Sequence, residues 1–162
     1  MKGSLDTRLD SIYNTEPVFD LHETMVYSDV GIIILGKIVE TISKVKLDAF
    51  VQSNIFDPLG MNNTFYNPPK EKLHRMVPTE IDPKGNLIKG YVHDENAYSI
   101  GGVAGHAGLF SKTKDLAIFS QMMLNKGLYG WKRIFRSETV DLFTQRSNII
   151  QGDSCLLYTS DA

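Results

Sequence analysis

The sequence has almost no cysteine, no long hydrophobic run and no excess of charge of one sign. One cysteine, Cys155, stands among 162 residues, so the chain cannot form an internal disulfide. Lysine and arginine number 17 against 19 aspartates and glutamates, and the net charge is −2. This balance excludes a protein that binds nucleic acid through a clustered basic surface.

Membrane-spanning and signal segments are also missing from the sequence. The most apolar stretch, VGIIILGKIV at 30–39, contains a lysine and has about half of the ~20 residues that a membrane span requires. The N-terminal segment MKGSLDTRLD lacks the apolar core of a signal peptide. We therefore expect 30–39 to belong to a buried helix.

The C-terminal segment CLLYTSDA, residues 155–162, has no periodicity that links it to the residues before it. It can be back-translated in full as TGT CTC TTA TAC ACA TCT GAC GCT, which resembles a transposon-based sequencing adapter. We interpret 155–162 as read-through and exclude it from fold reasoning, as for any fusion scar. The alternative is a frayed native tail. Without this segment, residues 1–154 contain no cysteine.

Two helices are predicted in the first half of the chain. The first covers 30–42 with Asp29 as its N-cap, because apolar residues recur at spacings of three and four. These apolar residues are Ile34, Leu35, Ile38, Val39 and Ile42. The second helix covers 47–55 and ends in a turn at Pro58 and Gly60.

A β-hairpin is predicted at 76–92, where two short apolar runs flank the turn sequence DPKGN. Gly85 and Asn86 in that turn are suited to a positive φ. A glycine-rich loop follows at 94–108.

Two more helices are predicted in the last third. One covers 114–125, begins after Ser111 or Thr113 and ends before Gly127. Its inward residues are expected to be Leu116, Phe119, Met122 and Met123. Ser137 is expected to cap the last helix. The elements together indicate an α+β chain that is mostly helical, with few strands and long loops, which is typical of part of a larger domain.

Three phrases, in this order and spacing, resemble one family. The first is VYSDVG at 26–31 with LGKIVE at 35–40. The second is FDPLGMNNT at 56–64, and the third is GGVAGHAGLFS at 101–111 with DLA at 115–117. With these phrases in this order, the sequence resembles the serine beta-lactamase-related family, which includes class C beta-lactamases, penicillin-binding-protein-like peptidases and esterases. The resemblance runs from about residue 24 to residue 143.

The resemblance implies a fold and three site motifs. The parent fold is a helical domain packed on an antiparallel sheet flanked by helices, and its sheet segments lie largely outside this chain. The motifs are a serine nucleophile in Ser-x-x-Lys, a Tyr-x-Asn loop that relays a proton, and a Lys-Thr-Gly or His-Thr-Gly strand. With the sheet segments outside, apolar helix faces such as Ile34, Ile38 and Ile42 lack a partner.

The sequence Tyr27-Ser28-Asp29 matches the second motif by position. The resemblance implies that Tyr27 is the proton shuttle, held near a lysine cation so that it can act as a base. Asp29 departs from the usual asparagine, and a carboxylate cannot donate the hydrogen bond of an amide. Its first role is therefore expected to be the helix cap, with substrate contact second.

Two literal Ser-x-x-Lys strings are interpreted as chance matches. Ser43 follows the apolar face of the first helix, where Lys46 does not stack beneath it. Ser111 opens a helix after Tyr27, whereas the family order places the nucleophile first, so Ser111 is expected to be a cap. Neither a nucleophile motif nor the third motif is therefore found here.

The string His106-Ala107-Gly108 resembles the third motif only superficially, because that motif comes later in the family. We expect it to line the substrate cleft with small residues, with His106 contacting substrate or hydrogen-bonding its own loop. The other histidines, His22, His74 and His93, have no zinc-ligand spacing. The sequence thus predicts no metal and no cofactor.

The resemblance implies part of a serine hydrolase that forms an acyl-enzyme with beta-lactams, D-amino peptides of muropeptides, or small esters. This chain alone is expected to be inert. Family analogy places the parent in the bacterial periplasm or outside the cell, and the GHAGLFS wording resembles members fused to a glycoside hydrolase family 3 domain. The alternative is a non-catalytic cell-wall or ligand-binding module with a degenerate site.

Overall fold

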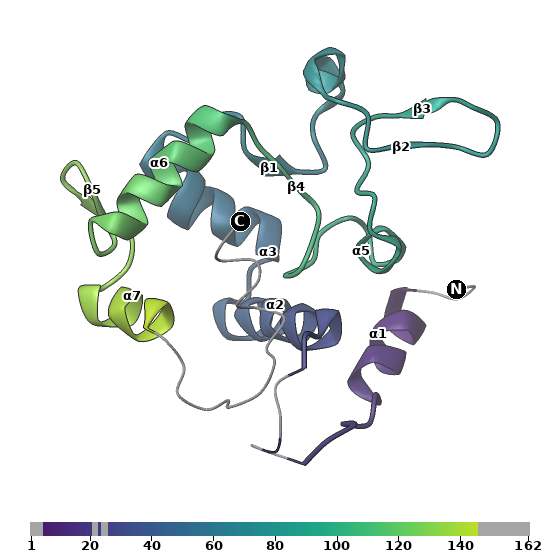
Figure 1. Ribbon diagram of the computed structural model, residues 1–162, viewed down its shortest axis with the longest axis horizontal. Coiled ribbons are helices and arrows are strands. Elements are labelled where there is room, and N and C mark those ends of the chain that lie inside the picture. Colours follow the sequence, from purple (N-terminus) through teal and green to yellow (C-terminus); the bar gives the residue numbers. More distant parts are fainter. Residues whose placement is uncertain (1–4, 21–22, 24–25, 146–162) are drawn as a thin grey trace.

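The computed structural model describes residues 5–20, 23 and 26–145 (Figure 1). The segment 155–162, expected to be read-through, lies outside the described residues. The elements in chain order are α1 (Leu5–Tyr13), α2 (Asp29–Ser43), α3 (Leu47–Val51), the π-helical η1 (Gln52–Phe56), α4 (Asp57–Leu59), β1 (Phe65–Tyr66), the 3-10 helix η2 (Lys70–Arg75), β2 (Glu80–Ile81), β3 (Leu87–Ile88), α5 (Glu95–Ser99), β4 (Leu109–Phe110), α6 (Thr113–Leu124), β5 (Leu128–Tyr129), β6 (Lys132–Arg133) and α7 (Ser137–Thr144).

The strands of the described part form three separate antiparallel pairs rather than one sheet. Strands β2 and β3 form the predicted hairpin, which projects from the rest of the molecule (Figure 1). Gly85 in its turn has the expected positive φ of +84°, whereas Asn86 keeps a negative φ and bonds Asp82 through its side chain. The mostly helical α+β prediction is confirmed.

Helix α2 begins one residue earlier than predicted, and its cap is Ser28. The Ser28 hydroxyl oxygen accepts a hydrogen bond from the Gly31 N–H at 3.2 Å. The prediction that Asp29 is the N-cap was therefore wrong: Asp29 is the first residue of the helix. A carboxylate at that position is still favourable, because the N-terminal end of a helix attracts negative charge.

The two sides of α2 differ in burial. Ile33 and Gly36 are buried, while Leu35, Ile38 and Ile42 are 55%, 45% and 77% exposed. The prediction of a buried helix thus holds for one side only. Among the described residues, Leu35, Ile38 and Ile42 are left about half or more exposed, as the resemblance implied for Ile38 and Ile42, whereas Ile34 is half-buried. No helix in the described part is both long enough and apolar enough to cross a membrane.

The second predicted helix is interrupted by a π-helical turn. Helix α3 passes through η1 into α4, and the run ends at Gly60, whose φ is +70°. This is the stop predicted from Pro58 and Gly60. Phe56 at the end of η1 and Leu59 in α4 are buried in one cluster with Met122 of α6.

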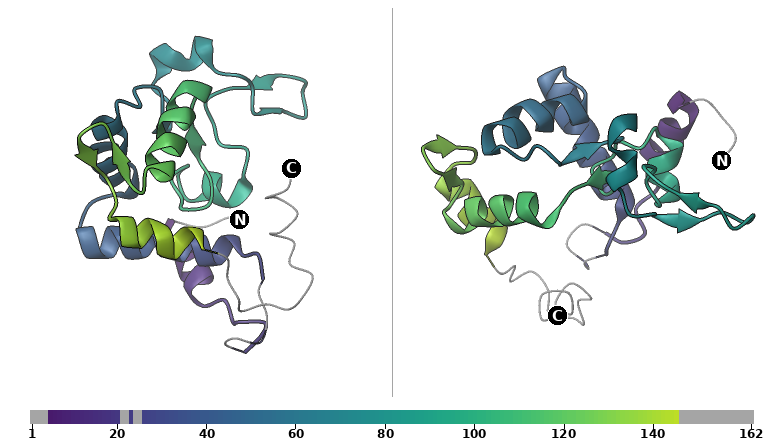
Figure 2. Two further views of the ribbon diagram at one scale, coloured as in Figure 1. Left: turned by 60° about the vertical axis from the view of Figure 1, so that its left-hand side comes forward. Right: turned by 90° about the horizontal axis from the view of Figure 1, so that it is seen from above.

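The described apolar residues form two clusters rather than one core. The first joins α1, α2, α5 and the loop after α5, and its buried members are Ile33, Ala97, Ile100 and Ala104. The second joins η1, α4, α6 and the β5–β6 hairpin, and its buried members are Phe56, Leu59, Met61 and Met122. Figure 2 shows α6 next to the α3–η1–α4 run and α1 on the other side of the molecule.

The last two long helices start without the predicted side-chain caps. The N-cap positions of α6 and α7 are Lys112 and Arg136, and neither side chain makes a cap hydrogen bond. The cap predictions for Ser111, Thr113 and Ser137 were therefore wrong: Thr113 and Ser137 are the first residues inside their helices.

The predicted inward face of α6 is mostly correct. Met122 is fully buried, and Phe119 and Met123 pack on the second cluster. Leu116 is 54% exposed, so its inward placement was wrong. Gly127 follows the helix with a φ of +84°, as predicted.

Gly105 allows the glycine-rich loop to touch the backbone of α2. A Cβ atom at Gly105 would lie 2.2 Å from the carbonyl oxygen of Ile32, and a Cβ at Gly36 would lie 3.2 Å from the Gly105 nitrogen. Real Cβ atoms do not approach a backbone oxygen this closely, so loop and helix can be in contact only while residue 105 has no side chain. This contact sets the distance between the two segments that carry the expected site.

We expect Gly105→Ala to lower the free energy of unfolding by about 2 kcal/mol, the usual cost of overpacking. The matched control is Gly31→Ala, whose Cβ would make ordinary contact with Ser28 at 3.9 Å. Because alanine favours a helix over glycine, Gly31→Ala should raise stability by about 0.5–1 kcal/mol. Urea unfolding of the wild type, Gly105→Ala and Gly31→Ala measures both changes. Equal stability of Gly105→Ala and the wild type would contradict the close contact between residue 105 and the Ile32 carbonyl.

Candidate active site

The three sequence phrases come together in space, although residues 41–100 lie between the first phrase and the third. Strand β1, just after the second phrase, pairs with β4 inside the third phrase, with Tyr66 opposite Leu109. The Tyr66 hydroxyl donates to the carbonyl oxygen of Ala104 at 2.9 Å. Burial raises the pKa of Tyr66, so this phenol keeps its proton and acts as a donor. The first phrase joins them through Gly36, which packs against the backbone of Gly105.

The glycine-rich segment contains a short helix that the sequence did not predict. Helix α5 is capped by Asp94, whose carboxylate accepts from the Ala97 N–H at 2.7 Å. After α5 the chain turns back on itself, and Gly108 takes a φ of +111° beside the carbonyl oxygen of Gly102. A Cβ at Gly108 would lie 2.3 Å from that oxygen, so this turn needs glycine.

A buried hydrogen-bond network ties the second phrase to α6. Asp115, 2% exposed, accepts from the Asn63 N–H at 2.7 Å and from the Thr64 hydroxyl at 3.0 Å. The Ser111 hydroxyl lies 2.8 Å from the Thr64 hydroxyl. Since the Thr64 proton goes to the carboxylate, the Ser111 hydroxyl donates to Thr64. Ser111 is therefore the outer donor of this network rather than the cap of α6.

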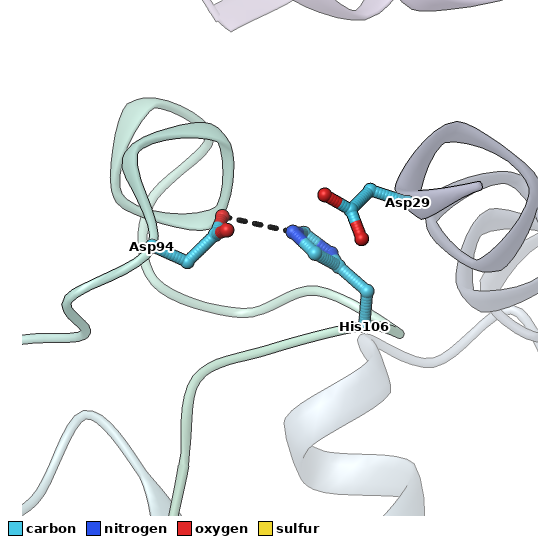
Figure 3. Close-up of side chains that lie close together, drawn as sticks. All are labelled: Asp29, Asp94 and His106. Atoms are coloured by element: carbon cyan, nitrogen blue, oxygen red, sulfur yellow. Dashed lines mark hydrogen bonds and ion pairs between the residues drawn. The ribbon is translucent and has the colours of Figure 1, made fainter. Parts of the chain in front are cut away.

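His106 lies between two carboxylates that come from different elements (Figure 3). Its Nε2 is 2.8 Å from the Oδ1 of Asp94, which precedes α5. Asp29, at the start of α2, faces the other side of the ring (Figure 3). One nitrogen or oxygen atom from each of the three residues lies within 4.8 Å of the others. The His106 side chain is 4% exposed, and its Nδ1 is buried without a hydrogen-bond partner.

The pKa of Asp94 lies below its usual range, mainly because the backbone N–H of Ala97 donates to the carboxylate. The hydrogen bond from His106 acts in the same direction. A carboxyl group with a lowered folded pKa stabilises the fold above its unfolded pKa of about 4. That stabilisation is lost as the pH falls through the lower folded value.

We therefore expect Asp94→Asn to be less stable than the wild type at pH 6, with the difference shrinking as the pH falls to 3. Asparagine caps a helix about as well as aspartate does, so the substitution removes the charge and keeps the cap. Thermal melts of both chains over this pH range measure the difference. A difference that stays constant with pH would show that the charge of Asp94 does not contribute.

The predicted site residues are partly brought together. One carboxylate oxygen of Asp29 lies within 4.8 Å of a His106 ring nitrogen, and Tyr27 lies two residues before Asp29 with 75% of its surface exposed. Ala107 packs against the first apolar cluster, and Gly108 is buried at the turn. The Tyr27 side chain thus faces open space, while the His106 ring is enclosed.

Asp94 is the member of this group that sequence reasoning missed. The sequence predicts only a glycine-rich loop at 94–108, and the position of Asp94 three residues before Ala97 is the signal that could have indicated a helix cap. His93 forms a separate pair with Glu80 at 2.6 Å on the exposed hairpin. His22 lies outside the described residues.

A hollow of about 680 Å³ lies on another part of the surface, between α1, the β2–β3 hairpin and α5. Its lining includes Arg8, Tyr91, His93 and Tyr98, and does not include Tyr27 or His106. The expected site is therefore not this hollow, but the exposed start of α2 with the glycine-rich segment behind it.

Comparisons with known proteins agree with the three phrases. The Beta-lactamase family model matches residues 2–149. A protein of Salmonella heidelberg with the name "Putative D-alanyl-D-alanine carboxypeptidase" is 40% identical over 159 residues, which is 89% of this chain and 37% of that protein. The chain thus spans little more than a third of the length of the curated relatives that it matches.

Solved structures show the same fold. Simvastatin synthase from Aspergillus terreus aligns with a TM-score of 0.63 at 21% identity, over 88% of this chain and 36% of that one. A beta-lactamase/D-alanine carboxypeptidase from Pseudomonas syringae aligns with a TM-score of 0.60 at 19% identity, over 81% and 34% of the two chains. At these identities the likeness concerns the fold. Because the family model matches residues 2–149 of the 162 in the chain, the chain belongs to the Beta-lactamase family, which includes serine beta-lactamases and penicillin-binding-protein-like proteins.

Proposed function

We propose that residues 1–154 are an internal part of a serine hydrolase that acts on beta-lactam, D-amino peptide or ester substrates through an acyl-enzyme. The observation that carries this proposal is the position of Tyr27. It lies directly before Ser28, the N-cap of α2, and within residues 2–149, which match the Beta-lactamase family model. D-Amino peptides of this kind occur in the bacterial cell wall, so by family analogy we place the parent protein in the periplasm or outside the cell.

Tyr27 is the proton shuttle in this proposal. The serine oxygen bonds to the substrate carbonyl carbon as the serine proton passes to the Tyr27 oxygen, which must enter this step as a phenolate. Collapse of the tetrahedral adduct then breaks the acyl C–N or C–O bond, and the leaving amine or alcohol takes that proton from Tyr27. A tyrosine can take up this proton near neutral pH only beside a cation. The lysine of a Ser-x-x-Lys motif from another segment of the parent supplies that cation. The exposed position of Tyr27 leaves it open to such a segment.

Asp29, His106, Ala107 and Gly108 form the substrate side of the site in this proposal. A carboxylate accepts hydrogen bonds and does not donate them. Asp29 in place of asparagine therefore favours a substrate that presents a donor there, such as an amide N–H or an ammonium group. The glycine-rich segment lets the backbone come close to the substrate.

The two Ser-x-x-Lys strings of the chain are engaged elsewhere, which supports an inert chain. The Ser43 hydroxyl donates to the Val39 carbonyl at the end of α2, and Lys46 lies 3.9 Å from Glu40. The Ser111 hydroxyl is held by Thr64. In the part of the chain that the structure describes, neither serine hydroxyl is hydrogen-bonded to a lysine, histidine or carboxylate that could take its proton.

The experiment that tests the proposal is covalent labelling with a fluorescent penicillin. The purified chain should take up no label. The longer protein, meaning residues 1–154 together with the segments that precede and follow them in the gene, should be labelled at one serine upstream of residue 1. Labelling of the chain itself that is lost in Ser111→Ala would show that Ser111 is the nucleophile.

The second candidate function is a non-catalytic module that binds cell-wall peptides on the same scaffold. Asp29 favours it, because the family asparagine is replaced. A longer protein that binds muropeptides, takes up no penicillin label and has no upstream Ser-x-x-Lys would establish this alternative.

A further inference from the structure

His106 lies between carboxylates that come from two separate elements. Asp94 precedes α5, Asp29 is the first residue of α2, and Figure 3 shows the imidazole ring between them. One nitrogen or oxygen atom of each residue lies within 4.8 Å of those of the other two, and the described part of the chain has no second group of this kind. Imidazole nitrogen and carboxylate oxygen are donor atoms that Zn²⁺ takes in proteins.

The hydrogen bond to Asp94 decides which nitrogen of the ring carries hydrogen. Nε2 lies 2.8 Å from the Oδ1 of Asp94. A carboxylate only accepts hydrogen bonds, so the hydrogen is on Nε2 and the Nδ1 of the neutral ring has a lone pair. Asp94 is itself fixed by the Ala97 N–H, which donates to its carboxylate at 2.7 Å. Histidines that bind a metal through one ring nitrogen commonly donate the other N–H to a carboxylate in this way.

The buried Nδ1 is a separate observation that points to a ligand. The His106 side chain is 4% exposed, and among the described residues its Nδ1 has no hydrogen-bond partner. A buried polar atom without a partner is costly. Asp29, on the side of the ring away from Asp94 (Figure 3), cannot remove this cost, because a carboxylate also presents only lone pairs. A cation between them satisfies both.

We propose that Asp29, Asp94 and His106 form a binding site for one divalent transition-metal ion of the Zn²⁺ type. Nδ1 of His106 and one oxygen of Asp29 are the ligands, and Asp94 orients the ring. Two ligand bonds of about 2.0–2.2 Å each together span about 4 Å. A carboxylate oxygen of Asp29 lies within 4.8 Å of a ring nitrogen, so a small side-chain rotation is enough to bind one ion. Water completes the coordination.

The donor atoms select the class of ion. Ca²⁺ and Mg²⁺ prefer sites made of oxygen atoms, whereas imidazole suits Zn²⁺, Ni²⁺ and Cu²⁺. The three residues come from separate segments of the sequence, which is why the spacing of the histidines predicted no metal. The ion ties the start of α2 to the segment before α5, and the site does not depend on the proposed hydrolase reaction.

Calorimetric titration with ZnCl₂ tests the site on the chain itself, made without a histidine tag and stripped of metal with EDTA. The chain should bind one Zn²⁺ at pH 7. His106→Gln should abolish this binding, because a glutamine amide can replace Nε2 as the donor to Asp94 but has no atom at the position of Nδ1. Asp29→Ala should also abolish it. Asp94→Asn, which keeps the cap of α5, should lower the affinity by about 10- to 100-fold, the usual effect of changing a residue that orients a ligand.

The matched control is His93→Gln. His93 also pairs with a carboxylate, Glu80, at 2.6 Å, but on the exposed hairpin. Its replacement should leave the stoichiometry and affinity for Zn²⁺ unchanged, and CaCl₂ should not bind to the wild type. Absence of Zn²⁺ binding, or binding that survives in both His106→Gln and Asp29→Ala, would overturn the proposal.

A measurement without substitutions keeps the test decisive if a variant does not fold. One equivalent of ZnCl₂ should shift the Nδ1 resonance of His106 in ¹⁵N spectra of the wild-type chain while Nε2 keeps its hydrogen. A shift confined to the other histidines would contradict the site. If the chain binds Zn²⁺ as expected but the longer protein takes up no penicillin label, the metal site stands and the proposed function fails.

Discussion

Replacing Tyr27 with phenylalanine in the longer protein should lower the acylation rate constant by about 10²- to 10⁴-fold, the range for loss of a general base. The substitution removes only the hydroxyl, and Tyr27 is 75% exposed in the described structure, so the fold should not change. Initial binding of the penicillin should also change little, because the proton is transferred only as the serine attacks. Rapid-mixing measurements of the labelling rate against penicillin concentration separate the two constants.

The matched control is Tyr98→Phe. Tyr98 is 62% exposed on α5 and makes an edge contact with the Tyr91 ring, which phenylalanine preserves. The longer protein with Tyr98→Phe should be acylated at the wild-type rate. Equal rates for Tyr27→Phe and the wild type would show that the lysine or a water molecule takes the proton without Tyr27. The acyl-enzyme part of the proposal would then stand, and the role of Tyr27 would not.

The helices could be predicted because local patterns dominate them. Pro58 and Gly60 stop the second helical run, and Gly127 ends α6, as their backbone preferences require. Caps were less predictable. Ser28, Asp29, Ser111, Thr113 and Ser137 are all acceptable cap residues, but only Ser28 caps a helix, and the Ser111 hydroxyl is engaged by Thr64 instead.

The candidate site likewise contains residues that the sequence indicates and one that it does not. The sequence indicated Tyr27, Asp29 and His106 through the resemblance, and the structure brings Asp29 and His106 together. Asp94 was missed because its role depends on a five-residue helix, α5, whose glycine-rich surroundings predict a loop. Burial of one side of α2 was also unpredictable in detail, because the row of Leu35, Ile38 and Ile42 is as apolar as the side that is buried.

Asp115 shows why two of the family phrases occur together. Its carboxylate, on the first turn of α6, accepts from the backbone and side chain of the loop at 63–64. The Thr64 hydroxyl, which donates to this carboxylate, in turn accepts a hydrogen bond from the Ser111 hydroxyl. A buried carboxylate is tolerated when donors surround it and a helix N-terminus lies beside it. The phrase ending in NNT therefore needs the aspartate of the phrase that follows it by about 50 residues.

Removing this carboxylate should have the largest effect on stability. We expect Asp115→Ala to lower the free energy of unfolding by about 3 kcal/mol, because two buried donors lose their acceptor. Asp115→Asn, which retains one acceptor oxygen, should cost about half as much by the same reasoning. Urea unfolding of the chain measures these changes.

The control for Asp115 is Asp141→Ala. Asp141, on α7, forms an exposed ion pair with Lys126, and such surface pairs contribute less than about 1 kcal/mol. Both substitutions remove an acidic side chain from a helix, so a difference between them reports burial and hydrogen bonding rather than net charge. If Asp115→Ala were no more destabilising than Asp141→Ala, the network through Thr64 and Ser111 would not hold α6 in place. The structural role of the Ser111 hydroxyl would then no longer argue against Ser111 as the nucleophile.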